Sequence, residues 1–130
     1  IREIQNTIHA KPISATKIMS DSIFTQIINR EIPANIIFED DKSIIIEDIS
    51  PQAPIHYLAI PKKEIKGVSD LTESDSEIIG HLLMTIKREM DNLKIKDYRL
   101  VINNGSEAGQ TVFHLHIHIL AQRTLGWPPG

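Results

Sequence analysis

The sequence predicts a single α+β domain in which an antiparallel five-stranded sheet packs against one long and one short helix. Three observations predict this architecture: a length of 130 residues, a series of short β-prone runs separated by turn signals, and one long stretch with helical periodicity. The length suits one domain. Strands joined by short loops pair antiparallel, and a helix with one apolar stripe covers one face of the sheet they form.

The first half of the chain predicts a short helix followed by a β-hairpin. Apolar residues over 21–29 share one helical face, which starts beside the capping pair Ser20-Asp21 and ends before Pro33. Two β-prone runs follow, at 35–39 and 43–47, and acidic residues typical of a turn separate them.

The second half predicts three further strands and the long helix. Residues 56–60 form the third expected strand, which a proline closes. The long helix is expected over 72–93, because a capping-box pattern precedes a continuous apolar stripe. The fourth and fifth strands are expected over 98–103 and 111–121.

Composition excludes several classes of protein. The formal net charge is −3, which is not the basic excess of a protein that binds nucleic acid. The sequence has no cysteine, so disulfides, thiol nucleophiles and sulfur-ligated zinc are excluded. No apolar run reaches the roughly 18 residues of a membrane span. We therefore expect a cytoplasmic protein that binds neither nucleic acid nor membrane.

We expect no ordered structure in the N-terminal segment. Residues 1–18 lack a sustained period and an apolar run, so a secretory signal is not expected there. Met19 is our preferred native start, which makes 1–18 a non-native or disordered extension. The single domain then comprises 19–130, including a Trp-Pro-Pro-Gly tail that regular structure cannot accommodate.

Three histidines alternate with apolar residues in the last expected strand. Side chains two apart on a strand share a face, so His114, His116 and His118 are expected on one face, opposite Phe113 and its apolar partners. Three interpretations are open: a polar outer face, a metal site, or catalysis in which one imidazole attacks while the others orient or donate.

A glycine-containing loop leads directly into this strand. Gly105 and Gly109 allow positive φ and a close approach of main-chain N–H groups to a ligand. Asn103, Gln110 and Thr111 add side-chain donors. Such a loop can hold a phosphate without a lysine, and its position beside the histidines favours catalysis on a phosphorylated substrate.

The segment His114-Leu115-His116-Ile117-His118-Ile119-Leu120 resembles the histidine-triad signature. The wider resemblance is to the Hint branch, the histidine triad nucleotide-binding proteins. It extends over about 20–130 and includes the segments 30–34, 37–41, 48–54, 60–63 and 127–130. It implies an antiparallel α+β fold, a homodimer that joins two sheets into one continuous sheet, and hydrolysis of purine nucleoside 5′-phosphoramidates.

The resemblance also implies a role for each matching residue. His116 matches the nucleophile that forms a nucleotidyl-histidine intermediate, and His118 matches the group that donates to the phosphate. His114 matches the residue that orients its neighbours, and His56 a further histidine near the triad. The implied nucleotide-binding residues are Asp48, Ile49, Asn103, Gly109, Gln110, Thr111, His116 and His118.

Two departures from the family pattern stand near the implied site. Thr111 replaces a usual serine, keeping the hydroxyl that can protonate the leaving amine, and Ile46-Glu47 replaces a Phe-His pair beside the base. Trp127 matches a tail residue that reaches the partner subunit's site. We expect no metal and no cofactor.

Other functions stay open at this level. The same fold could serve a hydrolase of dinucleoside polyphosphates or of nucleotidylated nucleic-acid ends. A non-enzymatic purine nucleotide-binding or scaffold protein and a zinc hydrolase that uses the three histidines are further alternatives.

Overall fold

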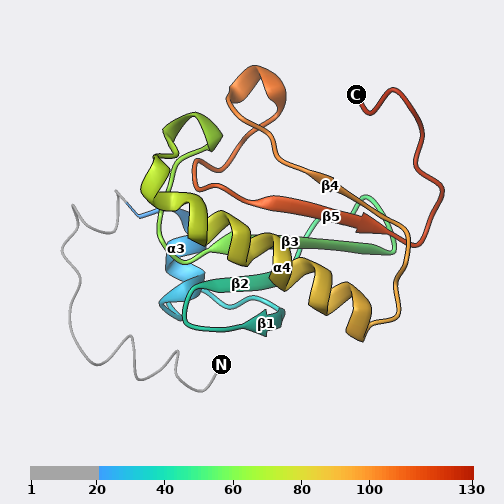
Figure 1. The fold of residues 1–130 in the computed structure, drawn as a ribbon, viewed down its shortest axis with the longest axis horizontal. Coiled ribbons are helices and arrows are strands. Elements are labelled where there is room, and N and C mark those ends of the chain that lie inside the picture. Colours follow the sequence, from blue (N-terminus) through green and yellow to red (C-terminus); the bar gives the residue numbers. More distant parts are fainter. Residues whose placement is uncertain (1–20) are drawn as a thin grey trace.

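The fold is that of a computed structural model, which describes residues 21–130. Our expectations for the extension 1–18, for Met19 and for Ser20 lie outside the described residues. The element labels below are those of Figure 1.

The centre of the molecule is a five-stranded antiparallel sheet. Its strands are β1 (Ile36–Glu39), β2 (Ser43–Glu47), β3 (Ile55–Pro61), β4 (Tyr98–Val101) and β5 (Ile117–Ala121). They lie in the order β1-β2-β3-β5-β4, and each neighbouring pair is antiparallel. In the described part of the chain, β1 and β4 are therefore the two edges of the sheet (Figure 1).

One long and one short α-helix flank the sheet. They are α4 (Ser76–Asn92) and α3 (Ile23–Ile28), and α4 runs across one face (Figure 1). Three single-turn 3-10 helices complete the structure, at Val68–Asp70, Glu73–Asp75 and Ser106–Ala108. The predicted fold class, an antiparallel five-stranded sheet with one long helix, is confirmed.

Alternation along the strands divides the core between the two helices. On β2, Ile45 packs in the α4 cluster, whereas its neighbours Ile44 and Ile46 pack with α3. The same alternation assigns Ala59 of β3 to the α4 face. His56 of β3 has the same parity as the residues that face α3, so its ring belongs to the α3 face.

Hydrogen-bonded caps begin α3 and the 3-10 helix Glu73–Asp75 that leads into α4. The predicted capping box is confirmed: the Thr72 N–H donates to the Asp75 carboxylate over 2.9 Å, and the Thr72 hydroxyl donates to the same group. The prediction for the short helix was wrong, because Ser22 and not Ser20-Asp21 is the N-cap. Its hydroxyl accepts from the Thr25 N–H over 2.9 Å.

The strand predicted over 111–121 is shorter than the alternation suggests. β5 begins at Ile117, and the preceding residues leave the ladder. The reason is a competing partner: the Leu115 N–H donates to the carbonyl of Ile65, in the segment that follows β3. Of the three triad histidines only His118 is a strand residue, so the prediction that all three line one face of a strand is wrong.

The structure corrects two further predictions, the end of β4 and the burial of Phe113. β4 ends at Val101, two residues before its predicted end. Phe113 does not join the apolar face with Leu115, because its side chain is 45% exposed. No helix among residues 21–130 is long and apolar enough to cross a membrane.

Candidate active site

A cavity of about 410 Å³ opens on the α3 face of the sheet. One wall is apolar and comes mainly from α3, with Ile23, Phe24 and Ile27. The floor carries His116 and His118. The other lining residues are Ile32, Pro33, Ala34, Ile46, Glu47, Asp48, Ile49, Ser50, Leu58, Asn103, Gly109, Thr111 and Val112. The cavity thus combines an apolar slot with polar groups at one end, which is the usual composition of a small-molecule site.

The hydrogen bond of His116 selects its tautomer. Its Nδ1 lies 2.7 Å from the carbonyl oxygen of His114, and a carbonyl can only accept, so Nδ1 carries the proton. Burial lowers the pKa of His116, although the hydrogen bond to His114 opposes this. The ring is therefore neutral at pH 7, and Nε2 is the nitrogen with a free lone pair.

A second chain of hydrogen bonds selects the tautomers of His56 and His118. The main-chain N–H of Gln52 donates to His56 Nδ1 over 3.0 Å, so the proton of the neutral ring is on His56 Nε2. This Nε2 lies 2.9 Å from His118 Nδ1 and donates to it. The remaining proton of His118 is then on Nε2, which makes His118 a donor to whatever occupies the cavity.

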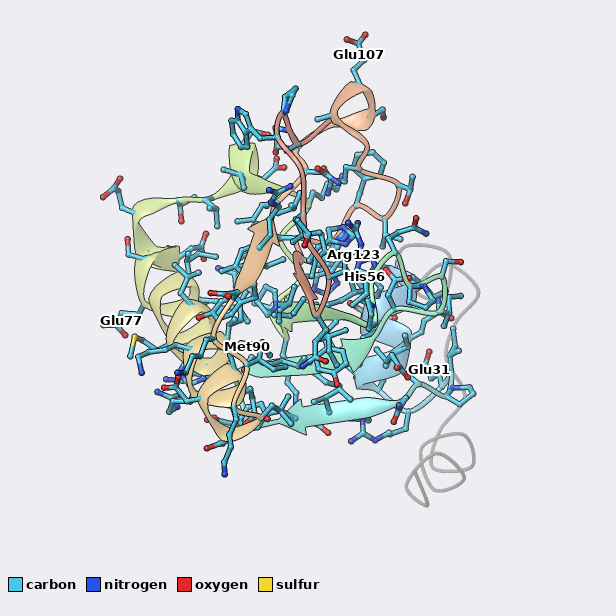
Figure 2. The ribbon with its side chains drawn as sticks, turned by 90° about the vertical axis from the view of Figure 1, so that its right-hand side faces the viewer. Glu31, His56, Glu77, Met90, Glu107 and Arg123 are labelled. Atoms are coloured by element: carbon cyan, nitrogen blue, oxygen red, sulfur yellow. The ribbon has the colours of Figure 1, made fainter. Side chains whose placement is uncertain are left out.

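His118 stays neutral over most of the pH range. Burial lowers its pKa to about 4, and repulsion from any charge on His116 or His56 acts in the same direction. His56 is buried in the interior of the molecule (Figure 2). The register of β3 and β5 brings the two rings together across 62 residues of sequence.

His114 lies beneath the cavity and does not line it. It is fully buried, and its Nε2–H donates to the carbonyl of Pro61 over 2.8 Å. Its Nδ1 accepts from the Ser22 hydroxyl over 2.7 Å. Burial lowers its pKa as well. The ring anchors the start of α3 to the end of β3, while the main-chain carbonyl of His114 orients His116.

Most, but not all, of the expected residues of the glycine-containing loop line the cavity. Gly105 and Gly109 have φ values of 94° and 97°, a region that favours glycine. Asn103, Gly109 and Thr111 line the cavity. The expectation that the Gln110 amide faces the ligand is corrected by the structure.

Gln110 is buried and its side chain is used to hold the loop together. Its amide donates to the carbonyls of Lys66 and Val112 over 2.7 Å and 3.1 Å, and its Oε1 accepts from the Gly105 N–H over 2.8 Å. These bonds satisfy the amide within the protein, so Gln110 supports the loop rather than lining the cavity.

The loop after β2 supplies the polar end of the apolar slot. The Asp48 carboxylate accepts from the Ser50 N–H over 2.7 Å, and its other oxygen lies 3.4 Å from His56 Nε2. Ile49 projects beside it with 97% of its side chain exposed. Glu47 also lines the cavity and accepts from the Asn35 amide over 2.8 Å.

The hydrogen bonds of the histidines occupy or protonate the ring nitrogens that would have to bind a metal ion. Asp48, His56 and His118 offer ligand atoms within 4.8 Å of one another. However, the Gln52 N–H occupies His56 Nδ1, so the nitrogen that would bind the metal is the protonated one. Both ring nitrogens of His114 are bonded to protein groups, so the three triad histidines do not converge on one ion.

The C-terminal tail leaves β5 at the end of the sheet that lies away from α3 (Figure 1). Trp127 is 83% exposed and is not among the residues that line the cavity.

Sequence reasoning assigned no role to two groups that shape the site. One is the Ser22 hydroxyl, for which an N-cap pattern was the available signal. The other is the main-chain N–H of Gln52, which no residue type encodes.

Comparisons with known proteins agree with this arrangement. A family model described as the scavenger mRNA decapping enzyme C-terminal binding domain matches residues 21–126. An uncharacterised HIT-like protein of Synechocystis is 54% identical over 111 residues, covering 85% of this chain and 97% of the relative. A similar protein of Synechococcus elongatus is 49% identical, with the same coverage of both chains.

Solved structures give the same result. A HIT family hydrolase from Legionella pneumophila has a TM-score of 0.82 and 41% identity, covering 85% of this chain and all of that one. A histidine triad protein from Clostridium difficile has a TM-score of 0.79 and 36% identity, covering 82% and 95%. With the alternating histidines and the cavity described above, these similarities show that the chain belongs to the histidine triad (HIT) family and has the fold of HIT family hydrolases.

Proposed function

We propose that the protein hydrolyses purine nucleoside 5′-phosphoramidates through a nucleotidyl intermediate on His116, as its resemblance to the Hint branch implies. The observation that carries the proposal is the bond from His116 Nδ1 to the His114 carbonyl, which leaves Nε2 as an unprotonated nucleophile at the cavity. Relatives that are named HIT family hydrolases support a hydrolytic reaction.

In the first step, His116 Nε2 attacks the α-phosphorus and the bond between phosphorus and the amine breaks. The amine leaves with a proton, which the Thr111 hydroxyl at the cavity wall can deliver. His118 Nε2–H donates to a phosphate oxygen as negative charge develops there. Asp48 accepts from the ribose hydroxyls and the base occupies the apolar slot; the support is that Asp48, Ile49 and residues of α3 line one cavity.

In the second step, water attacks the same phosphorus and the bond to His116 Nε2 breaks. The products are a nucleoside monophosphate and the free imidazole. The attacking water gives its proton to Thr111, which had lost one to the leaving amine. Because imidazole is a good leaving group at neutral pH, the intermediate can turn over.

Intact-protein mass spectrometry tests this mechanism. Wild type and His118→Ala are mixed with an adenosine phosphoramidate, quenched without acid and weighed, with His116→Ala as control. We expect a mass increase of one nucleoside monophosphate, most abundant in His118→Ala and absent from His116→Ala. Hydrolysis by His116→Ala at the wild-type rate would refute the proposal.

A second candidate follows from the matching family model, whose description names a decapping enzyme. Here the same nucleophile cleaves a dinucleoside polyphosphate, and a nucleotide replaces the amine as leaving group. Competition between a diadenosine polyphosphate and a phosphoramidate separates the two, since the preferred substrate has the larger kcat/KM.

We also propose that the protein is a homodimer in which the tail of one subunit reaches the cavity of the other. Two features support this assembly: the outer edge of β4 has no partner strand within residues 21–130, and Trp127 is exposed and does not line the cavity of its own chain.

A further inference from the structure

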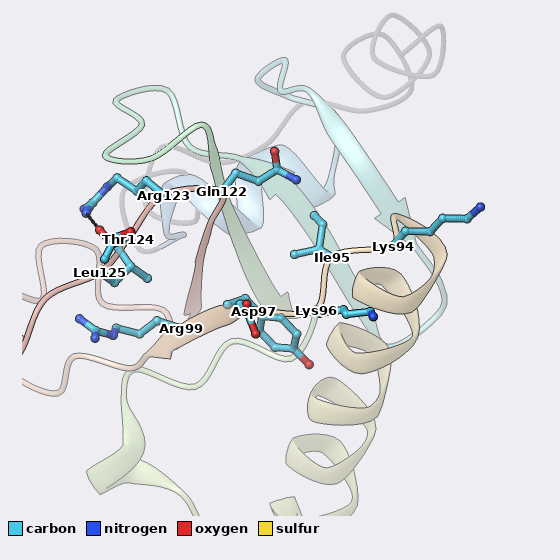
Figure 3. Close-up of a pocket in the computed structure, with 10 residues that line it drawn as sticks. Lys94, Ile95, Lys96, Asp97, Arg99, Gln122, Arg123, Thr124 and Leu125 are labelled. Atoms are coloured by element: carbon cyan, nitrogen blue, oxygen red, sulfur yellow. Dashed lines mark hydrogen bonds between the residues drawn. The ribbon is translucent and has the colours of Figure 1, made fainter.

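Arg123 joins two irregular segments near the histidine pair. Its Nε donates to the carbonyl of Gln52 over 2.9 Å. Its Nη1 donates to the carbonyl of Thr124 over 3.0 Å (Figure 3). The preceding residue, Gln122, has a φ of 73°, which turns the chain sharply after β5. This turn brings Arg123 beside the loop that precedes β3, although 71 residues separate Arg123 from Gln52 in sequence.

Two groups hold the proton of His56 on Nε2: the Gln52 N–H at Nδ1, and the Asp48 carboxylate, which lies 3.4 Å from Nε2. The Gln52 carbonyl accepts from Arg123, and its N–H donates to His56 Nδ1 over 3.0 Å. The two bonds therefore act on the same residue from opposite sides. Gln52 itself is exposed and belongs to no strand or helix. Its side-chain amide donates to the carbonyl of Ser50 over 3.0 Å within the same loop, so the bond from Arg123 is the one that ties Gln52 to a distant segment.

We propose that Arg123 is a positioning residue for the reaction: by holding Gln52 in place, it keeps the proton of His118 on the nitrogen that faces the substrate. The inference rests on the proposed function for the role of that proton. Arg123 does not line the active-site cavity of about 410 Å³, and within residues 21–130 its hydrogen bonds go to Gln52 and Thr124 rather than to the triad histidines.

The alternative state shows why the tautomer matters. Without the Gln52 N–H, His56 Nδ1 can take a proton from water, and His56 Nε2 then becomes the acceptor. His118 Nδ1 carries the shared proton in that state, and His118 Nε2 loses its proton to water. Each ring still holds one proton, but a lone pair replaces the donor that faces the phosphate. That lone pair repels the phosphate oxygens.

The expected effect of Arg123→Ala on the reaction is modest, because the hydrogen bond between Arg123 and Gln52 is exposed to solvent. Arg123 is exposed, so a charged hydrogen bond there contributes less than a buried one. We expect Arg123→Ala to lower kcat by about fivefold while KM changes little, since the donor acts mainly as charge develops.

The test measures tautomers directly. Protein with ¹⁵N-labelled histidine is studied above the pKa of every ring by long-range ¹H–¹⁵N spectra, for wild type, Arg123→Ala and Arg99→Ala. Arg99→Ala is a matched control, because it removes the same charge as Arg123→Ala. Both arginines line one surface cavity of about 800 Å³, which is separate from the active-site cavity (Figure 3). Among residues 21–130, the Arg99 side chain makes no hydrogen bond to the Gln52 loop.

We expect Arg123→Ala to shift the ring nitrogens of His56 and His118 together toward the opposite tautomers, and Arg99→Ala to match wild type. Unchanged nitrogen shifts in folded Arg123→Ala would overturn the inference, even if activity fell. Far-UV circular dichroism checks the fold, and Arg123→Gln serves if the alanine variant is unstable. If the tautomers shift but no variant cleaves a phosphoramidate, the proposed function fails and the positioning role stands.

Discussion

At the residue scale, the proposed nucleophile His116 and the proposed donor His118 are both neutral imidazoles. Each role needs one particular nitrogen to be free, and each is assigned by a bond to main chain: His116 by the His114 carbonyl and His56 by the Gln52 N–H. Neutral imidazoles are maintained because burial lowers the pKa of His114, His116 and His118 below 6.5.

These pKa values predict the acid limb of the pH profile. The proposed mechanism requires unprotonated His116, so the acid limb of kcat/KM should be centred below pH 6.5. The pKa of His118 is 6.5 in the unfolded chain and about 4 in the folded protein, so the unfolded chain binds more protons between these pH values. The free energy of unfolding should therefore also decrease as pH drops below 6.5. Steady-state rates, measured with circular dichroism at each pH, check both effects; an acid limb centred at or above 6.5 would contradict the assignment.

At the element scale, Asp40 connects the β1–β2 turn to α4. Its carboxylate accepts from the N–H groups of Lys42 and Ser43 over 2.9 Å and 2.7 Å, and from the Ser43 hydroxyl. His81 of α4 lies 2.7 Å from its other oxygen. Burial alone would raise the pKa of Asp40, but these hydrogen bonds outweigh it and hold the pKa at about 2.

We expect that loss of the Asp40 hydrogen bonds lowers the free energy of unfolding. Asp40→Ala should lower the free energy of unfolding by about 1–3 kcal/mol, because several turn donors lose their acceptor. The exposed neighbour is the control, since Asp41→Ala should change stability by less than about 0.5 kcal/mol. The contribution of Asp40 is complete above 3.8 and is lost as pH falls toward 2. Urea unfolding measures both; equal effects of the two variants would contradict the account.

At the scale of the whole molecule, the proposed dimer predicts a role for the tail. Trp127→Ala should lower kcat/KM by about tenfold, because a large aromatic anchor at an interface is lost, while the sedimentation mass stays that of a dimer. In a monomer the same change should have no effect on activity, since Trp127 is outside its own cavity. Sedimentation equilibrium and steady-state kinetics on one preparation decide between these outcomes.

Local patterns in the sequence were enough to predict most elements and the residues of the triad. The capping box of Thr72 and Asp75, the apolar stripe of α4 and the hairpin of β1 and β2 each depend on neighbours within a few residues. Such features are visible in sequence because helical and strand periods repeat over short distances. For the same reason the alternating histidines identified the candidate site.

The sequence by itself thus determined the fold class, the helices and strands, and the set of histidines. Only the tertiary structure decided which nitrogen of each ring is free. That outcome depends on the path of the main chain: the Ile65 carbonyl that shortens β5, the register that pairs His56 with His118 across 62 residues, and the loop that directs the Gln52 N–H at His56. Main-chain donors and acceptors are the same for nearly every residue type, so the paths of the loops, and not the residue pattern, select among them.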